Sequence, residues 1–95
     1  MNFLDLFNAI ARKARPAHHE FVPLDSMDIL FTDTDLDSLD MLMVAMFFSE
    51  IYGIDDEIAK YMTPASVQEM YDQIQEHKTK EPESLELAME AVAGW

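Results

Sequence analysis

Residues 39–52 constrain the fold more than any other segment, because eleven of these fourteen residues are apolar. The exceptions are Asp40, Ser49 and Glu50, and Gly53 follows as a natural residue to end a helix. A surface helix normally keeps one polar face, and this helix would nearly lack one. One apolar stripe of this helix is formed by Val44, Phe48, Ile51 and Tyr52, and the apolar surface extends well beyond that stripe.

A first helix is predicted over residues 3–14, with Asn2 as its N-cap and apolar residues at helical spacing. It should stop before Pro16, and its end is favoured by the basic residues Arg12, Lys13 and Arg15. Residues 15–37 then form a long loop, which in a compact domain is usually functional or contains a short helical turn. The apolar anchors expected for this loop are Phe21, Val22, Leu24, Met27, Ile29, Leu30 and Phe31.

Two helices are predicted between the apolar segment and the C-terminal region. Three acidic residues open a short helix over about 55–61. Ser66 and Glu69 match the capping-box pattern for a helix that begins at 64 or 67 and ends at 77.

A C-terminal helix is predicted over about 82–93, because Pro82 would be its first residue and Gly94 would follow its last. Its apolar stripe is Leu85, Ala88, Met89 and Val92. Docking on the rest of the protein, dimerisation and partner binding are the alternatives for this segment.

Charge and composition limit the functions that this chain can have. With 19 acidic and 6 basic residues the net charge is −13, which disfavours nucleic acids and anionic membranes as partners. No apolar stretch approaches the ~20 residues that span a bilayer, and no signal peptide is recognisable, so we expect a cytoplasmic protein. The lack of cysteine excludes disulfides, thiolate metal sites and a cysteine nucleophile. A domain this short is not expected to hold a deep catalytic cleft, so we expect no enzyme.

Eleven of the acidic residues lie within 20–59, which has no basic residue. Residues 33–37, Asp-Thr-Asp-Leu-Asp, imitate the start of a calcium-binding loop. Ser38 and Val44 then stand where that loop needs glycine and glutamate, so no EF-hand and no metal site are expected. The adjacent His18 and His19 have no third ligand nearby in the sequence and are expected to lie in a solvated loop.

Ser38 lies directly before the apolar segment. Either Ser38 or Asp37 can cap the helix that follows. A serine hydroxyl at a helix N-terminus is also suited to carry a covalently attached phosphate, because free N–H groups and the positive end of the dipole lie beside it. Acidic neighbours would repel that phosphate, so they must serve another purpose, such as recognition by the enzyme that delivers the group.

The chain resembles a discrete, type II acyl carrier protein over about residues 3–78. The resemblance rests on Asp37-Ser38-Leu39-Asp40, the long loop before it, the apolar helix, the short acidic helix and the final Ser66-Val67-Gln68 helix. It implies an all-α, four-helix bundle with a long loop between the first two helices, here with an extra C-terminal helix. The domain would span 1–80, with 81–95 as an extension.

The same resemblance implies the cofactor and the chemistry. A 4′-phosphopantetheine arm donated by coenzyme A would be attached to Ser38 through a phosphodiester. The thiol of the arm would hold acyl groups as thioesters for ketosynthases, acyltransferases or acyl-activating enzymes of fatty-acid, polyketide or related biosynthesis.

Recognition roles are also implied by the resemblance. A phosphopantetheinyl transferase would recognise Asp37, Leu39 and Asp40, and the residues facing later partners would be Leu39, Leu42, Met43, Met46 and Glu50. Two departures from the family pattern stand out: Asp35 replaces a glycine, and Glu50 alone keeps a charge where several glutamates are usual. We therefore expect an apolar, methionine-rich recognition surface and a specialised pathway.

Three alternatives stay open at this point. The methionines could pack beneath the C-terminal helix or in a dimer. The protein could be an acidic interaction module whose unmodified Ser38 is only a cap, or a cation-binding protein that uses Asp33, Asp35 and Asp37. In each case the expected core is Val44, Ala45, Phe48, Tyr52, Met62, Val67, Met70, Tyr71 and Ile74, which in a carrier is also a candidate shelter for part of an acyl chain.

Overall fold

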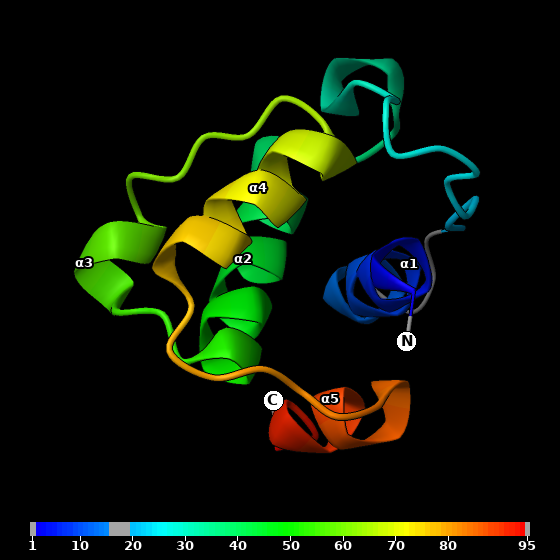
Figure 1. The fold of residues 1–95 in the computed structure, drawn as a ribbon. Coiled ribbons are helices and arrows are strands. Elements are labelled where there is room, and N and C mark those ends of the chain that lie inside the picture. Colours follow the sequence, from blue (N-terminus) through cyan, green and yellow to red (C-terminus); the bar gives the residue numbers. More distant parts are fainter. Residues whose placement is uncertain (1, 16–19, 95) are drawn as a thin grey trace.

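A computed structural model describes residues 2–15 and 20–94, and its regular elements in these ranges are all helices (Figure 1). The predicted all-α class is confirmed. The helices are α1 (Phe3–Ala14), the 3-10 helix η1 (Phe31–Asp33), α2 (Ser38–Tyr52), α3 (Asp56–Ala59), α4 (Val67–His77) and α5 (Leu85–Ala91). In the described part of the chain, none of these helices is long and apolar enough to cross a membrane.

Three predicted helix ends are confirmed by their hydrogen bonds and backbone angles. Asn2 caps α1, since its side-chain oxygen accepts the N–H of Leu4 at 2.8 Å. The hydroxyl of Ser66 accepts the N–H of Glu69 at 3.2 Å and caps α4. Gly53 ends α2 in the left-handed conformation with φ of 63°.

The start predicted for the C-terminal helix is wrong. Pro82 lies before α5, which begins at Leu85 because Ser84 is its N-cap and accepts the N–H of Leu87 at 3.1 Å. A serine hydroxyl satisfies one of the free N–H groups of the first turn, whereas a helix that began at Pro82 would have Glu81 at its N-cap, and glutamate is not a preferred capping residue.

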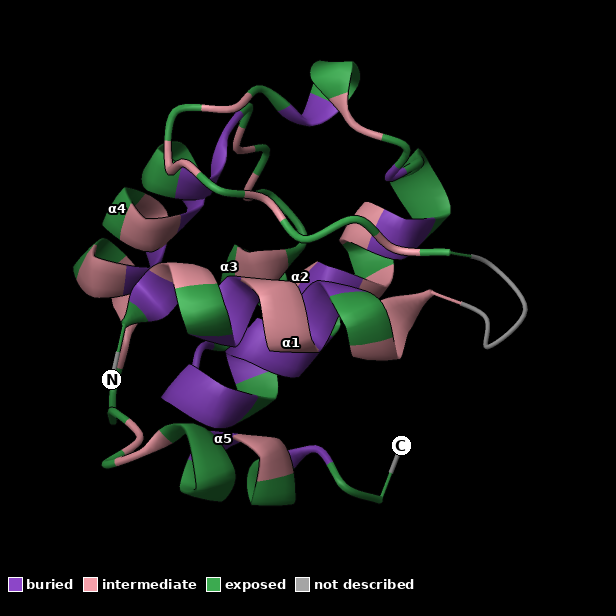
Figure 2. Cartoon of the chain, turned by 90° about the vertical axis from the view of Figure 1, so that its right-hand side faces the viewer, coloured by how far each residue is buried: buried purple, intermediate pink, exposed green. Residues whose placement is uncertain are grey.

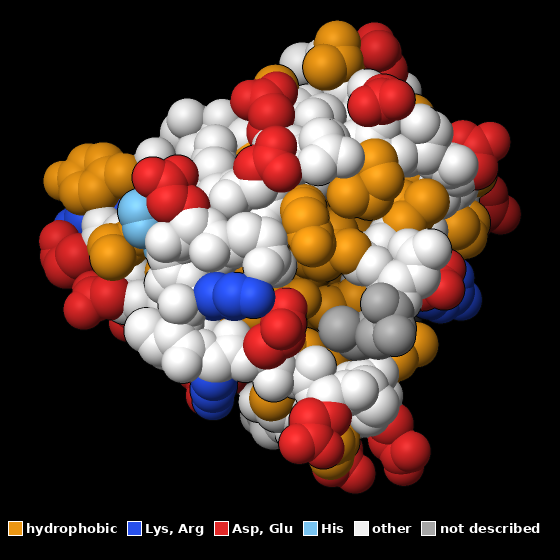
Figure 3. Space-filling view, viewed as in Figure 1, with side chains coloured by type: hydrophobic (Ala, Val, Ile, Leu, Met, Phe, Trp, Pro, Cys, Tyr) orange, Lys and Arg blue, Asp and Glu red, His pale blue; other side chains and the backbone are white. Residues whose placement is uncertain are grey.

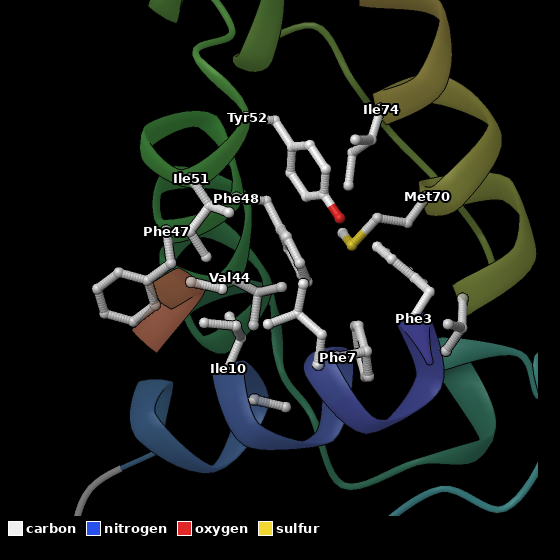
Figure 4. Packing of buried hydrophobic residues seen from close by; sticks show 14 of the residues in the cluster. Phe3, Phe7, Ile10, Val44, Phe47, Phe48, Ile51, Tyr52, Met70 and Ile74 are labelled. Carbon is white, nitrogen blue, oxygen red and sulfur yellow. The ribbon is translucent and has the colours of Figure 1, made fainter. Parts of the chain in front are cut away.

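The core lies where α1, α2 and α4 face one another (Figure 4). Phe7 of α1 stacks on Phe31 of the long loop with ring centroids 5.5 Å apart, and Phe3 stacks on Phe48 of α2 at 5.4 Å. Most of the predicted core is buried, namely Val44, Phe48, Tyr52, Val67, Met70 and Ile74. The remaining three predicted core residues are only half-buried and pack at its margin or face a groove; they are Ala45, Met62 and Tyr71.

The apolar surface of α2 is explained by its neighbours, since α1, α3 and α5 all pack against it. Phe47, on the side that Lys13 of α1 approaches, is only 2% exposed. Helix α5 docks through Ala88, and Val92 directly after the helix packs with it; both are fully buried, so docking is the alternative that the structure shows for this segment (Figure 2). Three apolar residues of α2 stay exposed, namely Leu39, Leu42 and Met46.

The long loop is held to two helices. The side-chain amide of Asn8 on α1 donates to the carbonyl of Leu24 at 2.9 Å and accepts the N–H of Leu24 at 2.8 Å. The N–H of Phe31 donates to the carbonyl of Ala65 just before α4. Two predicted anchors of the loop are wrong, because their side chains point into solvent; these are Val22 and Leu30.

Candidate functional site

Ser38 is the first residue of α2, and its side chain is exposed. Asp37, not Ser38, is the N-cap. The Asp37 carboxylate accepts the N–H of Asp40 at 2.8 Å, and the Asp40 carboxylate accepts the N–H of Asp37 at 3.2 Å. This reciprocal capping box leaves the Ser38 hydroxyl without a hydrogen-bond partner among the described residues. Helix geometry also leaves the N–H groups of Ser38 and Leu39 without intrahelical acceptors.

Arg15 reaches the same turn from the end of α1. Its Nη1 donates to the carbonyl of Asp35 at 2.8 Å and lies 3.7 Å from the Asp40 carboxylate. The Arg15 and Asp40 side chains are only 13% and 9% exposed. Figure 2 shows the end of α1 on the same side of the molecule as the start of α2. Sequence reasoning treated Arg15 as a favourable helix end and missed this long-range contact.

The predicted recognition residues divide into an outer and an inner group. Leu39 and Leu42 are 66% and 53% exposed, and Met46 is 37% exposed, one to two turns further along α2. Glu50 and Asp37 are also exposed. The inner group consists of two residues, Met43, half-buried against the core, and Asp40, buried in the capping box.

A groove of about 370 Å³ runs between α2 and α3 beside this exposed apolar strip. Leu42, Ala45 and Met46 give it an apolar side. Lys60 at its edge is paired with Glu57 at 2.9 Å, so the positive charge there is balanced. The apolar side of the groove can therefore accept an apolar group. The remaining lining residues are Ser49, Glu50, Asp56 and Ala59.

The acidic residues before Ser38 do not assemble into a metal site. Within residues 2–15 and 20–94, no group of three or more histidine or acidic side chains could hold an ion, so Asp33, Asp35 and Asp37 form none. His18 and His19 lie outside the described residues.

A second hollow, of about 290 Å³, lies away from Ser38, between α1 and α4. Figure 3 shows an apolar patch in this region, on a face that is otherwise rich in carboxylates. Phe3, Met27 and Tyr71 line the hollow, together with Tyr52 and Glu81. Burial raises the pKa of the Tyr52 phenol to about 12, helped by the nearby Glu81 carboxylate and by Tyr71.

Comparison with protein-family models, with curated proteins and with solved structures found no match.

Proposed function

We propose that this protein is a discrete acyl carrier protein that bears a 4′-phosphopantetheine arm on Ser38. The observation that carries the proposal is the exposed Ser38 hydroxyl, free of hydrogen bonds within the described residues, on the first residue of a 15-residue helix. The order of the helices supports the proposal, with a long loop between α1 and α2 and a short acidic α3 before α4. In this proposal α1 to α4 form the carrier bundle, and α5 is an added helix.

The residues around Ser38 fit a phosphodiester. The first-turn N–H groups of Ser38 and Leu39 and the positive end of the α2 dipole would stabilise its negative charge. Asp37 is occupied by the capping box, so it does not compete for these two groups. The arm would supply a thiol for thioester chemistry in a chain that has no cysteine.

The attachment step is a phosphoryl transfer from coenzyme A, catalysed by a phosphopantetheinyl transferase. Ser38 Oγ forms a bond to the phosphorus that carries pantetheine, and the bond from that phosphorus to the bridging oxygen breaks. The nucleotide leaves with the bridging oxygen, and the serine proton passes to a base of the transferase. This chain contributes the nucleophile and its position, and other enzymes then act on the cargo.

Two neighbouring features would serve the carrier function. The groove between α2 and α3 has an apolar side, where Leu42, Ala45 and Met46 could contact part of an acyl chain. The exposed strip of Leu39, Leu42 and Met46 would meet ketosynthases, acyltransferases or acyl-activating enzymes through apolar contacts. A strip with so little charge favours a specialised set of partners in fatty-acid, polyketide or related biosynthesis.

Intact mass spectrometry tests the proposal. The protein is incubated with coenzyme A and a phosphopantetheinyl transferase, and we expect a gain of one phosphopantetheine group. Ser38→Ala should gain nothing, and Ser26→Ala, a matched serine change in the loop, should gain as wild type does. An unchanged mass of the wild type would refute the carrier function and leave an acidic interaction module.

A further inference from the structure

We infer that Arg15 is a positioning residue for Ser38. One guanidinium holds the chain on both sides of the serine, at the carbonyl of Asp35 and at the carboxylate of Asp40. The role in arm transfer rests on the proposed function, whereas the effect of Arg15 on the conformation of residues 35–40 does not.

The contacts form a short network that encloses Ser38. Arg15 Nη1 donates to Asp35 at 2.8 Å and lies 3.7 Å from Asp40 Oδ2. The same Oδ2 accepts the N–H of Asp37 at 3.2 Å, and Asp37 in turn accepts the N–H of Asp40. Arg15 therefore acts on the chain three residues before and two residues after Ser38, and no contact with the serine itself is seen among the described residues.

Burial makes this network effective. The Asp40 side chain is 9% exposed and the Arg15 side chain 13%, so water screens the pair poorly. A buried carboxylate needs hydrogen bonds and a counter-charge, and removal of one partner leaves the other uncompensated. The base of Arg15 is also fixed, because α1 is held in the core one turn earlier by Ile10 and Ala11.

The contact with Arg15 gives Asp40 a different role from recognition by a phosphopantetheinyl transferase, which the resemblance implied. Its carboxylate faces Arg15 and the N–H of Asp37, so it serves the conformation of the turn and not the surface met by an enzyme. An exposed hydroxyl reacts well only when its backbone is held in the reactive geometry, and small displacements cost large factors in rate.

The test uses two substitutions and a matched control. Arg15→Met keeps the aliphatic stem and removes the guanidinium. Arg15→Lys keeps the charge but replaces the planar guanidinium with a compact ammonium on a different stem, so it should restore the contacts only in part. Arg12→Met is the control, because Arg12 is exposed and lies on the same helix, three residues earlier.

Two measurements are made on each variant at a temperature where all remain folded. Amide hydrogen exchange on the unmodified protein should speed up about tenfold at Asp37 and Asp40 in Arg15→Met, less in Arg15→Lys, and remain unchanged at Ile74. The kcat/KM for arm transfer from coenzyme A should fall about tenfold in Arg15→Met and remain at the wild-type value in Arg12→Met.

Each outcome decides a separate point. Equal exchange and equal kcat/KM in Arg15→Met and Arg12→Met would overturn the inference. Faster exchange at every amide, Ile74 included, would also overturn it, because Arg15 would then be a general stabiliser. Local loosening with unchanged transfer would overturn the positioning role. If the wild type accepts no arm, the proposed function fails, while the exchange data still decide whether Arg15 holds residues 35–40.

Discussion

The hydroxyl of Thr79 donates a 2.6 Å hydrogen bond to the carbonyl oxygen of Gly53, 26 residues earlier in the chain. The backbone N–H groups of Thr79 and Lys80 both donate to the carbonyl of Tyr52. The segment between α4 and α5 is thus bound to the end of α2, which brings α5 to the surface that it covers.

Gly53→Ala should destabilise the protein by about 1–2 kcal/mol, since a side chain is strained at positive φ. The added Cβ would also collide with the Thr79 hydroxyl, which would have to move. Urea unfolding measures the change. Gly94→Ala is the control, because open space surrounds that position, and an equal loss in both variants would contradict this account.

Ala88→Asp should detach α5 and cost about 2 kcal/mol of unfolding free energy, because it places a charge in a fully buried position. Ala91→Asp, on the exposed side of the same helix, should change stability by less than about 0.5 kcal/mol. Thermal unfolding followed by circular dichroism separates the two. Equal melting temperatures would mean that α5 does not dock through Ala88.

Asp37→Ala should lower stability by about 1 kcal/mol, because it removes the N-cap of α2. Ser38→Ala should lie within about 0.5 kcal/mol of the wild type, since the exposed serine does not cap the helix. Both are measured by urea unfolding of the unmodified protein. A larger loss for Ser38→Ala than for Asp37→Ala would reverse the assignment of the cap.

Tyr52 should make stability fall as the pH rises from 10 toward 12. Its pKa is about 12 in the folded protein, against the ordinary tyrosine value of 10.0, so the unfolded chain releases the proton first and is favoured in this window. Below pH 10 the phenol is neutral in both states and contributes no slope. Tyr52→Phe should remove this fall in stability between pH 10 and 12, whereas Tyr61→Phe, at a 77% exposed position, should retain it. Urea unfolding of both variants across this pH range measures the difference.

The proposed carrier function predicts that partner recognition depends on apolar contacts more than on charge. Leu42→Ser and Met46→Ser should raise the KM of a cognate ketosynthase for the acylated protein, because both side chains are exposed on α2. Their effects on stability should stay within about 0.5 kcal/mol. Glu50→Lys is the comparison, and an effect of Glu50→Lys alone would show that charge governs recognition.

Local signals predicted much of the fold. Asn2, Ser66 and Gly53 act within a few residues of themselves, so a helix end can be predicted from the sequence beside it. The start of α5 was not predicted correctly, because Pro82 and Ser84 are both typical of a helix start. The N–H of Leu87 donates to the hydroxyl of Ser84, so the helix begins after Ser84.

Contacts between distant segments could not be predicted in this way. The apolar α2 residues were recognised, but whether Phe47 is buried and Leu42 exposed depends on where α1, α3 and α5 pack. The same holds for Arg15, whose basic character suits any helix end. Its contact with Asp40 exists only because the end of α1 meets the start of α2.

The attachment of the long loop has a consequence for the order of folding. The N–H of Gln68 donates to the carbonyl of Met27, and the N–H of Phe31 donates to that of Ala65, so both bonds close large chain loops. Contacts of high sequence separation cost chain entropy before they add stability, and they commonly form late. Phe3 and Phe48, which join α1 to α2, are at least as far apart in the sequence as the residues of these two bonds, so we expect the loop, α1 and α2 to become ordered together rather than one after another.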